Sequence, residues 1–407
     1  MSSISSSPVT KPTLDSAADP AVSAVLAALR QVAGAAANAP IGLHEPEFAG
    51  REWDYVKSCL DTGWVSSAGA FVDRFERELA DYTGTRHCIA TVNGTAALHL
   101  ALRLAGVEAG DEVIVPTIGF IATCNAVSYC GAVPHLVDSN ETTLGMDPAK
   151  LGSWLDEIAE RRTGGALLNR RTGRRLAAIV PMHTFGHPVE IDALLELAAR
   201  WNIPLVEDAA ESLGSTYRGR HCGSFGRLAA LSFNGNKIVT TGGGGAVLTD
   251  DAELARRAKH LSTTAKLSHR WRFDHDEVGY NYRLPNLNAA LGCAQLERMP
   301  SFLARKRRLA ESYRAAFAGI AGVRVFEEPA HAQSNYWLNV ILVEPKLRDP
   351  ILAATNEAGL MTRPAWTPMH RLPMYETAPR MDDLSVADEI ERRLINLPSS
   401  AGLAGHD

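Results

Sequence analysis

The chain has 407 residues, of which 46% are hydrophobic and 21% are charged, and its formal net charge is -5. This composition is typical of a globular protein with a large apolar core, divided into two or three domains. The slight acidity argues against a nucleic-acid-binding protein, because such proteins usually carry a basic excess. No apolar run reaches the roughly 18 residues that span a bilayer, so we expect no membrane association.

Cysteine and histidine usage predicts no metal site. The six cysteines, at positions 59, 88, 124, 130, 222 and 293, include no C-x-x-C pair, which argues against a zinc ribbon or a thioredoxin-type centre. His183 and His187 are four residues apart, but Gly186 and Pro188 argue against a helical metal-binding pair. No signal peptide pattern is present, and we therefore expect a cytoplasmic protein with reduced thiols.

The N-terminal part of the chain divides into three regions. Residues 1–20 are rich in Ser, Ala and Pro and are predicted to be a disordered tail. Residues 21–40 are predicted to form a helix and a linker. From residue 41, short apolar runs alternate with amphipathic stretches. The apolar runs, predicted as strands, are 88–92, 112–115, 133–137, 177–181, 205–206, 229–233 and 246–248, and the helices between them include 95–104, 123–130 and 191–201.

This alternation predicts an α/β fold for residues 41–285, with a mainly parallel central sheet that is flanked by helices. Ligands of such sheets bind beyond the carboxyl ends of the strands. The polar segment 163–175 is predicted to be a surface loop. A long helix from about 287 to 317 is predicted to lead into a smaller C-terminal α+β domain at 286–407. Its elements are a strand within 336–343 and helices at 350–358 and 386–394.

Two of the predicted strands end in residues that can carry chemistry. Strand 205–206 is followed by Asp208, which lies at the carboxyl edge of the sheet, although an acid there often only caps the next helix. Strand 229–233 contains Ser232 and leads to Lys237, and four glycines follow. Glycines permit close backbone approach, but Lys237 precedes them, which excludes a Walker phosphate loop. The alternative for Lys237 is an exposed side chain in a flexible turn.

Two further segments lie at predicted strand ends. Strand 88–92 leads through Gly94 into a helix that begins near Thr95. The free amides of its first turn, with the helix dipole, suit a phosphate, unless Thr95 only caps the helix. Strand 112–115 is followed by Phe120, whose ring can cover the flat face of a bound ring or pack in the core.

Together, the four segments supply a phosphate site, an aromatic lid, a carboxylate and a lysine on successive strand ends. Pyridoxal 5′-phosphate (PLP) requires all four. Its phosphate needs N–H donors and its ring needs a stacking partner. Its pyridine nitrogen stays protonated beside a carboxylate, and its aldehyde forms a Schiff base with a lysine. The sequence therefore predicts a PLP-dependent enzyme.

Over residues 41–400 the sequence resembles the DegT/DnrJ/StrS sugar aminotransferases, which are PLP-dependent enzymes of fold type I. Segments 93–98, 207–211, 232–237 and 279–283 carry this resemblance. Segments 43–46 and 63–67 further resemble the branch that makes 4-amino sugars for nonulosonic acids or bacillosamine.

The resemblance implies a role for each site residue. Lys237 would hold the cofactor covalently, and Asp208 would pair with its pyridine nitrogen. The other implied cofactor contacts are Gly94, Thr95, Ala96 and Ser232 at the phosphate, Phe120 on the ring, Glu211 near the ring hydroxyl, and Asn281 at the phosphate of a neighbouring subunit's cofactor. A homodimer with shared sites is therefore expected. The implied substrate contacts are Trp64, His183, Arg283 and His370, and a structural histidine or a surface arginine is an equal alternative.

The resemblance also implies the reaction. An amino group would pass from L-glutamate to the C4 ketone of a nucleotide-linked 4-keto-6-deoxy sugar, with UDP as the favoured nucleotide and pyridoxamine phosphate as the intermediate form of the cofactor. One alternative is a PLP-dependent sugar dehydratase or lyase, which the presence of Lys237 disfavours. A second is a non-catalytic cofactor-binding module, which the presence of both Asp208 and Lys237 disfavours.

Overall fold

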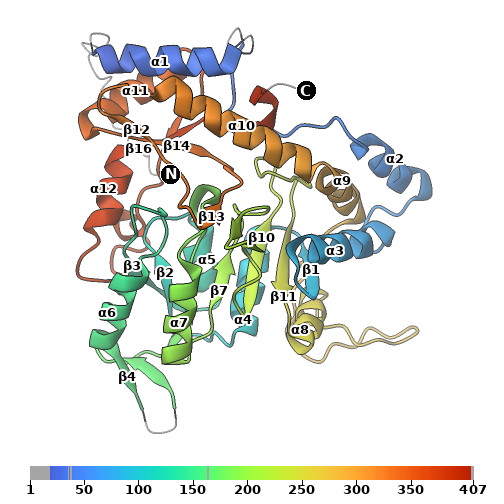
Figure 1. The fold of residues 1–407 in the computed structure, drawn as a ribbon. Coiled ribbons are helices and arrows are strands. Elements are labelled where there is room, and N and C mark those ends of the chain that lie inside the picture. The colour runs from blue at the N-terminus through green and yellow to red at the C-terminus, as the bar shows by residue number, and fades with distance from the viewer. Residues whose placement is uncertain (1–18, 35, 37–38, 163–164, 405–407) are drawn as a thin grey trace, which may run out of the picture.

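The structure is a computed structural model that describes residues 19–34, 36, 39–162 and 165–404. A central sheet, a smaller sheet and flanking helices account for most of these residues (Figure 1). The predicted tail at 1–20 lies almost wholly outside the described residues. None of the described helices combines the length and the apolarity needed to cross a bilayer.

The central sheet has seven strands. They are β1 (His87–Thr91), β2 (Glu112–Pro116), β3 (Val133–Val137), β6 (Leu176–Ile179), β7 (Val206–Asp208), β10 (Leu228–Ser232) and β11 (Gly245–Thr249). Hydrogen-bonded strand pairs form two groups, with the strand orders β3-β2-β6 and β7-β10-β11-β1. Isolated parallel bridges at the ends of β6 and β7 join the two groups into one sheet. Among the described strands of this sheet, β11 runs in the opposite direction to the other six, which confirms the predicted mainly parallel sheet.

Helices cover both faces of this sheet (Figure 1). Those around it are α2 (Glu52–Thr62), α3 (Ala70–Thr83), α4 (Gly94–Leu104), α5 (Ala122–Tyr129), α6 (Pro148–Ile158), α7 (Ile191–Trp201), α8 (Ala252–Ser262) and α9 (Asn286–Glu297). Alternate residues of β2 show the two faces, because Val113 and Val115 pack with α4, α5 and α8, whereas Ile114 packs with α6 and α7. Both faces are buried, as a parallel sheet requires.

The smaller domain is built on an antiparallel sheet of order β12-β14-β16-β15. Its strands are β12 (Val323–Val325), β14 (Asn339–Val343), β15 (Arg363–Pro364) and β16 (Leu394–Leu397), and its helices are α10 (Met299–Phe317), α11 (Pro345–Glu357) and α12 (Ser385–Arg393). The N-terminal helix α1 (Pro20–Ala33) lies across α10 and α11 and buries Val25 and Leu29 against them (Figure 1). The first described helix thus packs on the C-terminal domain.

Three local predictions were wrong in extent or type. The long helix is two helices, α9 and α10, which meet at Arg298, and Pro300 in the first turn of α10 has no amide to continue α9. Part of the predicted loop 163–175 is strand β5 (Leu167–Asn169), which pairs with β4 (Ala159–Arg161); positions 163 and 164 lie outside the described residues. Helix α11 begins before Pro350 and contains it. The helix predicted at 386–394 is confirmed within one residue at each end, as α12, and strand β16 follows it directly.

Three short strands connect the two domains. Strands β8 (Thr216–Tyr217) and β9 (Arg220–His221) form a hairpin in the large domain, and β13 (Ala332–Gln333) pairs with β8. Because β13 belongs to the C-terminal part of the chain, this pairing fixes the following residues, 334–337, beside the large domain.

Candidate active site

A cavity of about 670 Å³ lies at the carboxyl ends of β7 and β10, between the two domains. From the large domain and the segment before it, the lining residues are Leu43, Asn93, Gly94, Thr95, Leu98, Phe120, Ala122, Met182, Phe185, Asp208, Ala210, Glu211, Ser232, Asn234, Asn236 and Lys237. From the small domain they are Trp337, Leu338, Arg363, Pro364, Ala365, Trp366, Thr367 and Asn396. The cavity therefore brings together most of the predicted cofactor residues.

Lys237 follows β10 in a turn that its backbone amide closes by donating to Asn234 O at 2.9 Å. Its side chain is 11% exposed, and its Nζ lies 3.0 Å from Glu211 Oε1. The same Nζ lies 3.7 Å from the centroid of the Trp337 ring. Burial raises the pKa of Glu211 to about 7, although the charge and hydrogen bond of Lys237 act in the opposite direction. The amine is thus held between a carboxyl group and an aromatic face.

Asp208 ends β7 and is buried. Its Oδ2 accepts a hydrogen bond from Thr123 Oγ1 at 2.6 Å, and its Oδ1 accepts one from the Ala210 amide at 3.2 Å. Burial raises the pKa of Asp208, and the hydrogen bond from Thr123 opposes this effect. A desolvated carboxylate of this kind is stabilised by a cationic partner, and the protonated pyridine nitrogen of PLP would be one.

The start of α4 has backbone amides of the kind that the predicted anion site requires. Asn93 caps the helix, because its Oδ1 accepts a hydrogen bond from the Ala96 amide at 2.8 Å. The amides of Gly94 and Thr95 precede the first bond within the helix, and both residues line the cavity. A Cβ at position 94 would lie 2.7 Å from Ser232 Cβ, so only glycine lets the backbone approach Ser232 this closely.

Ala96 differs from the other predicted phosphate contacts. Its amide is already bonded to Asn93, and it does not line the cavity. The predicted contact assumed that all the first-turn amides were free, whereas the cap residue satisfies one of them.

The residues at this cavity fit PLP. Amides at a helix start and Ser232 suit the phosphate, Asp208 suits the pyridine nitrogen, and Lys237 suits the aldehyde. Phe120 is 47% exposed on the cavity wall, where its ring is available to a planar ligand, and it lies 6.1 Å from the Trp366 ring. When bound, PLP supplies an electron sink for reactions at the carbon that bears the substrate's amine.

Besides Ala96, five other predicted residues lie outside the cavity lining. Trp64, Asn281 and Arg283 are exposed, and Arg283 Nε donates to Asn281 Oδ1 at 3.1 Å. His183 is fully buried; its Nε2 lies 3.0 Å from a carboxylate oxygen of Glu207, and its Nδ1 accepts from a backbone amide, which suits a structural histidine. His370 Nδ1 lies 2.8 Å from the Thr117 hydroxyl.

None of the eight lining residues of the small domain was predicted, and Trp337, Arg363 and Trp366 have the largest side chains among them. A lone aromatic residue in a strand-like stretch indicates core packing more often than a site. Their place on the wall follows from how the two domains meet, and no local pattern marks it.

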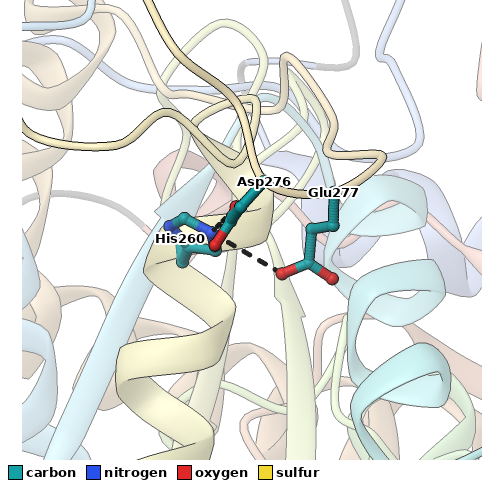
Figure 2. Close-up of side chains that lie close together, drawn as sticks. All are labelled: His260, Asp276 and Glu277. Atoms are coloured by element: carbon teal, nitrogen blue, oxygen red, sulfur yellow. Dashed lines mark hydrogen bonds and ion pairs between the residues drawn. The ribbon is translucent and has the colours of Figure 1, made fainter.

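A second group of ligand-type side chains lies away from the cavity, at the end of α8. His260, Asp276 and Glu277 approach one another there (Figure 2). His260 Nε2 is 2.7 Å from Asp276 Oδ1, and the Arg257 guanidinium donates to both carboxylate oxygens of Glu277. Because Arg257 already neutralises Glu277, we interpret this group as a surface ion-pair network.

The fold and this cavity define a PLP-dependent aminotransferase of fold type I. The chain belongs to the DegT/DnrJ/EryC1/StrS aminotransferase family, whose family model matches residues 46–407. It is a sugar aminotransferase, and PLP is its cofactor.

Relatives and solved structures agree with this assignment. The chain is 40% identical over 372 residues to the GDP-perosamine synthase of Caulobacter vibrioides. The aligned residues cover 90% of this chain and 95% of that protein. It is 35% identical to the putative PLP-dependent aminotransferase EpsN of Bacillus subtilis, over 89% of this chain and 92% of that protein. The crystal structure of the aminotransferase TlmJ from Streptoalloteichus hindustanus matches with a TM-score of 0.80 at 28% identity, over 88% of this chain and 93% of that one.

Proposed function

We propose that this enzyme transfers an amino group from L-glutamate to the C4 ketone of a nucleotide-linked 4-keto-6-deoxy sugar. One observation carries the proposal: Lys237, Asp208 and the start of α4 meet in a single cavity of about 670 Å³, which is closed on one side by the small domain. A volume of this size suits a cofactor together with part of a substrate.

The relatives inform the ketone position. A relative in Saccharopolyspora spinosa, 30% identical over 88% of this chain, is a 4-aminotransferase of a dTDP-linked 4-dehydro sugar. Another in Streptomyces venezuelae, 34% identical over 84% of this chain, is a transaminase of a dTDP-linked 3-amino sugar. The first relative supports a ketone at C4 of the substrate. The second relative makes C3 the alternative ketone position that an experiment must test.

The relatives also inform the nucleotide. Those in Caulobacter vibrioides, Escherichia coli O157:H7 and Vibrio cholerae are GDP-perosamine synthases, at 40%, 36% and 34% identity. We therefore propose a GDP-linked sugar for this chain, in place of the UDP-linked sugar that the sequence favoured.

The side chains of the cavity have distinct roles in this proposal. Lys237 Nζ takes the proton from the α-carbon of glutamate and, in the second half of the cycle, returns a proton to C4 of the sugar. Glu211, whose Oε1 lies 3.0 Å from that nitrogen, has a pKa of about 7 and is suited to exchanging protons with it near neutral pH. Asp208 keeps the cofactor's ring nitrogen charged. Both substrates use one cavity in turn, so ping-pong kinetics are expected.

A cytoplasmic homodimer is also part of the proposal. Large aromatic side chains lie exposed outside the cavity, with Trp53 77%, Trp271 70% and Phe273 76% exposed. Trp271 and Phe273 belong to the segment that extends away from the sheet beyond α8 (Figure 1). Exposed apolar groups of this size favour a protein interface, and Asn281 near the end of this segment is the residue proposed to reach the partner's cofactor.

The decisive experiment presents the holoenzyme with glutamate and with UDP-, GDP- or dTDP-linked 4-keto-6-deoxy sugars. We expect the GDP-linked sugar to gain an amino group by mass spectrometry, with an equal amount of 2-oxoglutarate formed. Loss of water from the sugar without 2-oxoglutarate would favour the dehydratase alternative. Amination of a 3-keto sugar alone would contradict the proposed C4 position.

A further inference from the structure

The carboxylate of Asp208 accepts two hydrogen bonds from the described part of the chain, and only one of the donors is a side chain. Thr123 Oγ1 donates to Oδ2 at 2.6 Å, and the Ala210 amide donates to Oδ1 at 3.2 Å. The shorter bond has the length that is typical of a hydroxyl donating to an ionised carboxylate. Asp208 lines the cavity but Thr123 does not, so the hydroxyl acts on a bound ligand through Asp208.

The helix that carries Thr123 holds its hydroxyl in place. Thr123 lies in the first turn of α5 and is buried. Further along α5, Cys124 and Val127 pack in the apolar core, and the hydroxyl of Tyr375, from the small domain, donates to Asn125 Oδ1 at 2.8 Å. Among the residues that the structure describes, Asp208 is the hydrogen-bond partner of the Thr123 hydroxyl. The hydroxyl is thus fixed against one oxygen of the carboxylate.

Charged side chains around Asp208 act on it in both directions. Lys237 and His183 favour its ionised form, whereas Glu211 carries a like charge when it is ionised and opposes that form. Burial raises the pKa of Asp208, and the hydrogen bond from Thr123 is the largest of the effects that lower it. The ionisation of this carboxyl group therefore depends on a neutral hydroxyl as well as on charges.

A carboxylate and a pyridine nitrogen in contact share one proton, which the stronger base holds. A hydrogen bond donated to the carboxylate stabilises its charged form and makes it a weaker base. The proton then stays on the ring nitrogen, where the positive charge makes the ring an electron sink. A carboxylate has about four lone-pair positions, so the bonds from Thr123 and Ala210 leave positions for the ring N–H.

We propose that Thr123 is a positioning residue for Asp208: its hydroxyl stabilises the carboxylate and so keeps the shared proton on the ring nitrogen of bound PLP. The inference rests on the proposed role of Asp208 and adds a residue outside the cavity lining to the cofactor site.

The first test measures the proton affinity of Asp208 in the apoenzyme and needs no turnover. Infrared spectroscopy follows protonation against pH, through the carboxyl band that Asp208→Asn lacks. Thr123→Val removes the hydroxyl and keeps the side-chain shape, so we expect the proton affinity of Asp208 to rise about 10-fold, because a bond to a charged group is lost. Thr123→Ser keeps the hydroxyl and should titrate close to wild type. An unchanged titration in Thr123→Val would overturn the proposal.

Thr83→Val is the matched control, because Thr83 is a buried helical threonine whose Oγ1 donates to Leu79 O at 2.9 Å, outside the cavity. It should leave the titration of Asp208 unchanged. Thr123→Ala is the second variant, since it removes the hydroxyl without placing a methyl group against Asp208, and the same rise is expected. An equal rise in Thr123→Ser would show that only the packing had changed, and it would also overturn the proposal.

The second test locates the proton in the holoenzyme. The variants are loaded with PLP that is isotopically labelled at its ring nitrogen, and nitrogen NMR at neutral pH reports the protonation of that nitrogen. We expect the signal of a protonated ring in wild type and Thr123→Ser, and a signal moved toward that of an unprotonated ring in Thr123→Val. A signal in Thr123→Val that equals that of wild type would overturn the proposal.

Asp208→Asn separates this inference from the proposed function. It should give the signal of an unprotonated ring, because an amide does not stabilise the positive charge as a carboxylate does. A wild-type signal in Asp208→Asn would show that the assigned role of Asp208 is wrong. A changed signal in Asp208→Asn, with wild-type signals in both Thr123→Val and Thr123→Ala, would defeat the role of Thr123 alone.

Discussion

At the scale of single residues, the cavity depends on two buried acids that have different partners. Glu211 lies beside the amine of Lys237, whereas Asp208 is held by a hydroxyl and a backbone amide and lies at a strand end. Burial raises the pKa of both, because water no longer solvates the charged forms. Cationic partners offset this cost, which is why a lysine and a cofactor with a charged ring suit the same cavity.

Replacement of Lys237 tests the central assignment. We expect Lys237→Ala to lower turnover by at least about 10³-fold, because no other side chain is proposed to hold the cofactor covalently or to move the proton. The wild-type holoenzyme should be yellow and should lose that absorbance on borohydride treatment, with the label on Lys237. Lys57→Ala serves as the control, since Lys57 is exposed on α2 and pairs with Asp61. Full activity in Lys237→Ala would show that Lys237 is not the cofactor lysine.

The titration of Glu211 predicts a pH dependence of stability. Its pKa is about 7 in the folded chain, against an ordinary value of 4.5. Between these values the folded chain keeps a proton that the unfolded chain has lost, so the stability contributed by this group falls as the pH rises. We expect the thermal midpoint of the apoenzyme to fall less between pH 5 and 7 in Glu211→Gln than in wild type. Parallel pH profiles, measured by differential scanning fluorimetry, would contradict this.

At the scale of elements, strand ends and helix starts do most of the positioning. Strands β7 and β10 deliver Asp208 and Ser232 to one edge because they are parallel neighbours. The cap at Asn93 holds the first turn of α4 against Ser232. These placements were predictable, because each depends on a strand or a helix that its own residues specify. The conformation of residues 334–337 was not predictable, because it depends on bonds to a distant loop.

The β4–β5 hairpin is hydrogen-bonded to strand β2 of the central sheet, and this bond gives a prediction for stability. Asn169 Nδ2 donates at 2.8 Å to Glu112, a fully buried carboxylate on β2. Asn169→Ala leaves that carboxylate with one donor fewer, so we expect a loss of about 1–3 kcal/mol in the free energy of unfolding. Urea denaturation of the apoenzyme measures the loss. Arg162→Ala, on the exposed end of the hairpin, should change stability by no more than about 0.5 kcal/mol. Equal effects of the two variants would show that the bond contributes little.

At the scale of the whole molecule, the two domains close one cavity and leave Asn281 outside it. If Asn281 completes the partner's site, Lys237→Ala and Asn281→Ala variants should complement each other when unfolded together and refolded as mixed dimers. Each mixed dimer then has one site in which both residues are intact. We expect up to about a quarter of wild-type activity from equal mixing, since half the dimers are mixed and each has one complete site. Activity no higher than the mean of the two parents would contradict the shared site.

The sequence by itself determined the fold class, the cofactor, and the strand ends near which Asp208 and Lys237 lie. These features depend on local periodicity and on residues placed directly at strand ends, where neighbours in sequence are neighbours in space. Only the tertiary structure decided that α1 packs on the small domain, that the Asn93 side chain already bonds the Ala96 amide, and that the Trp337 ring lies against Lys237 Nζ. Each of these depends on which distant surfaces meet when the two domains pack, and no local pattern records that choice.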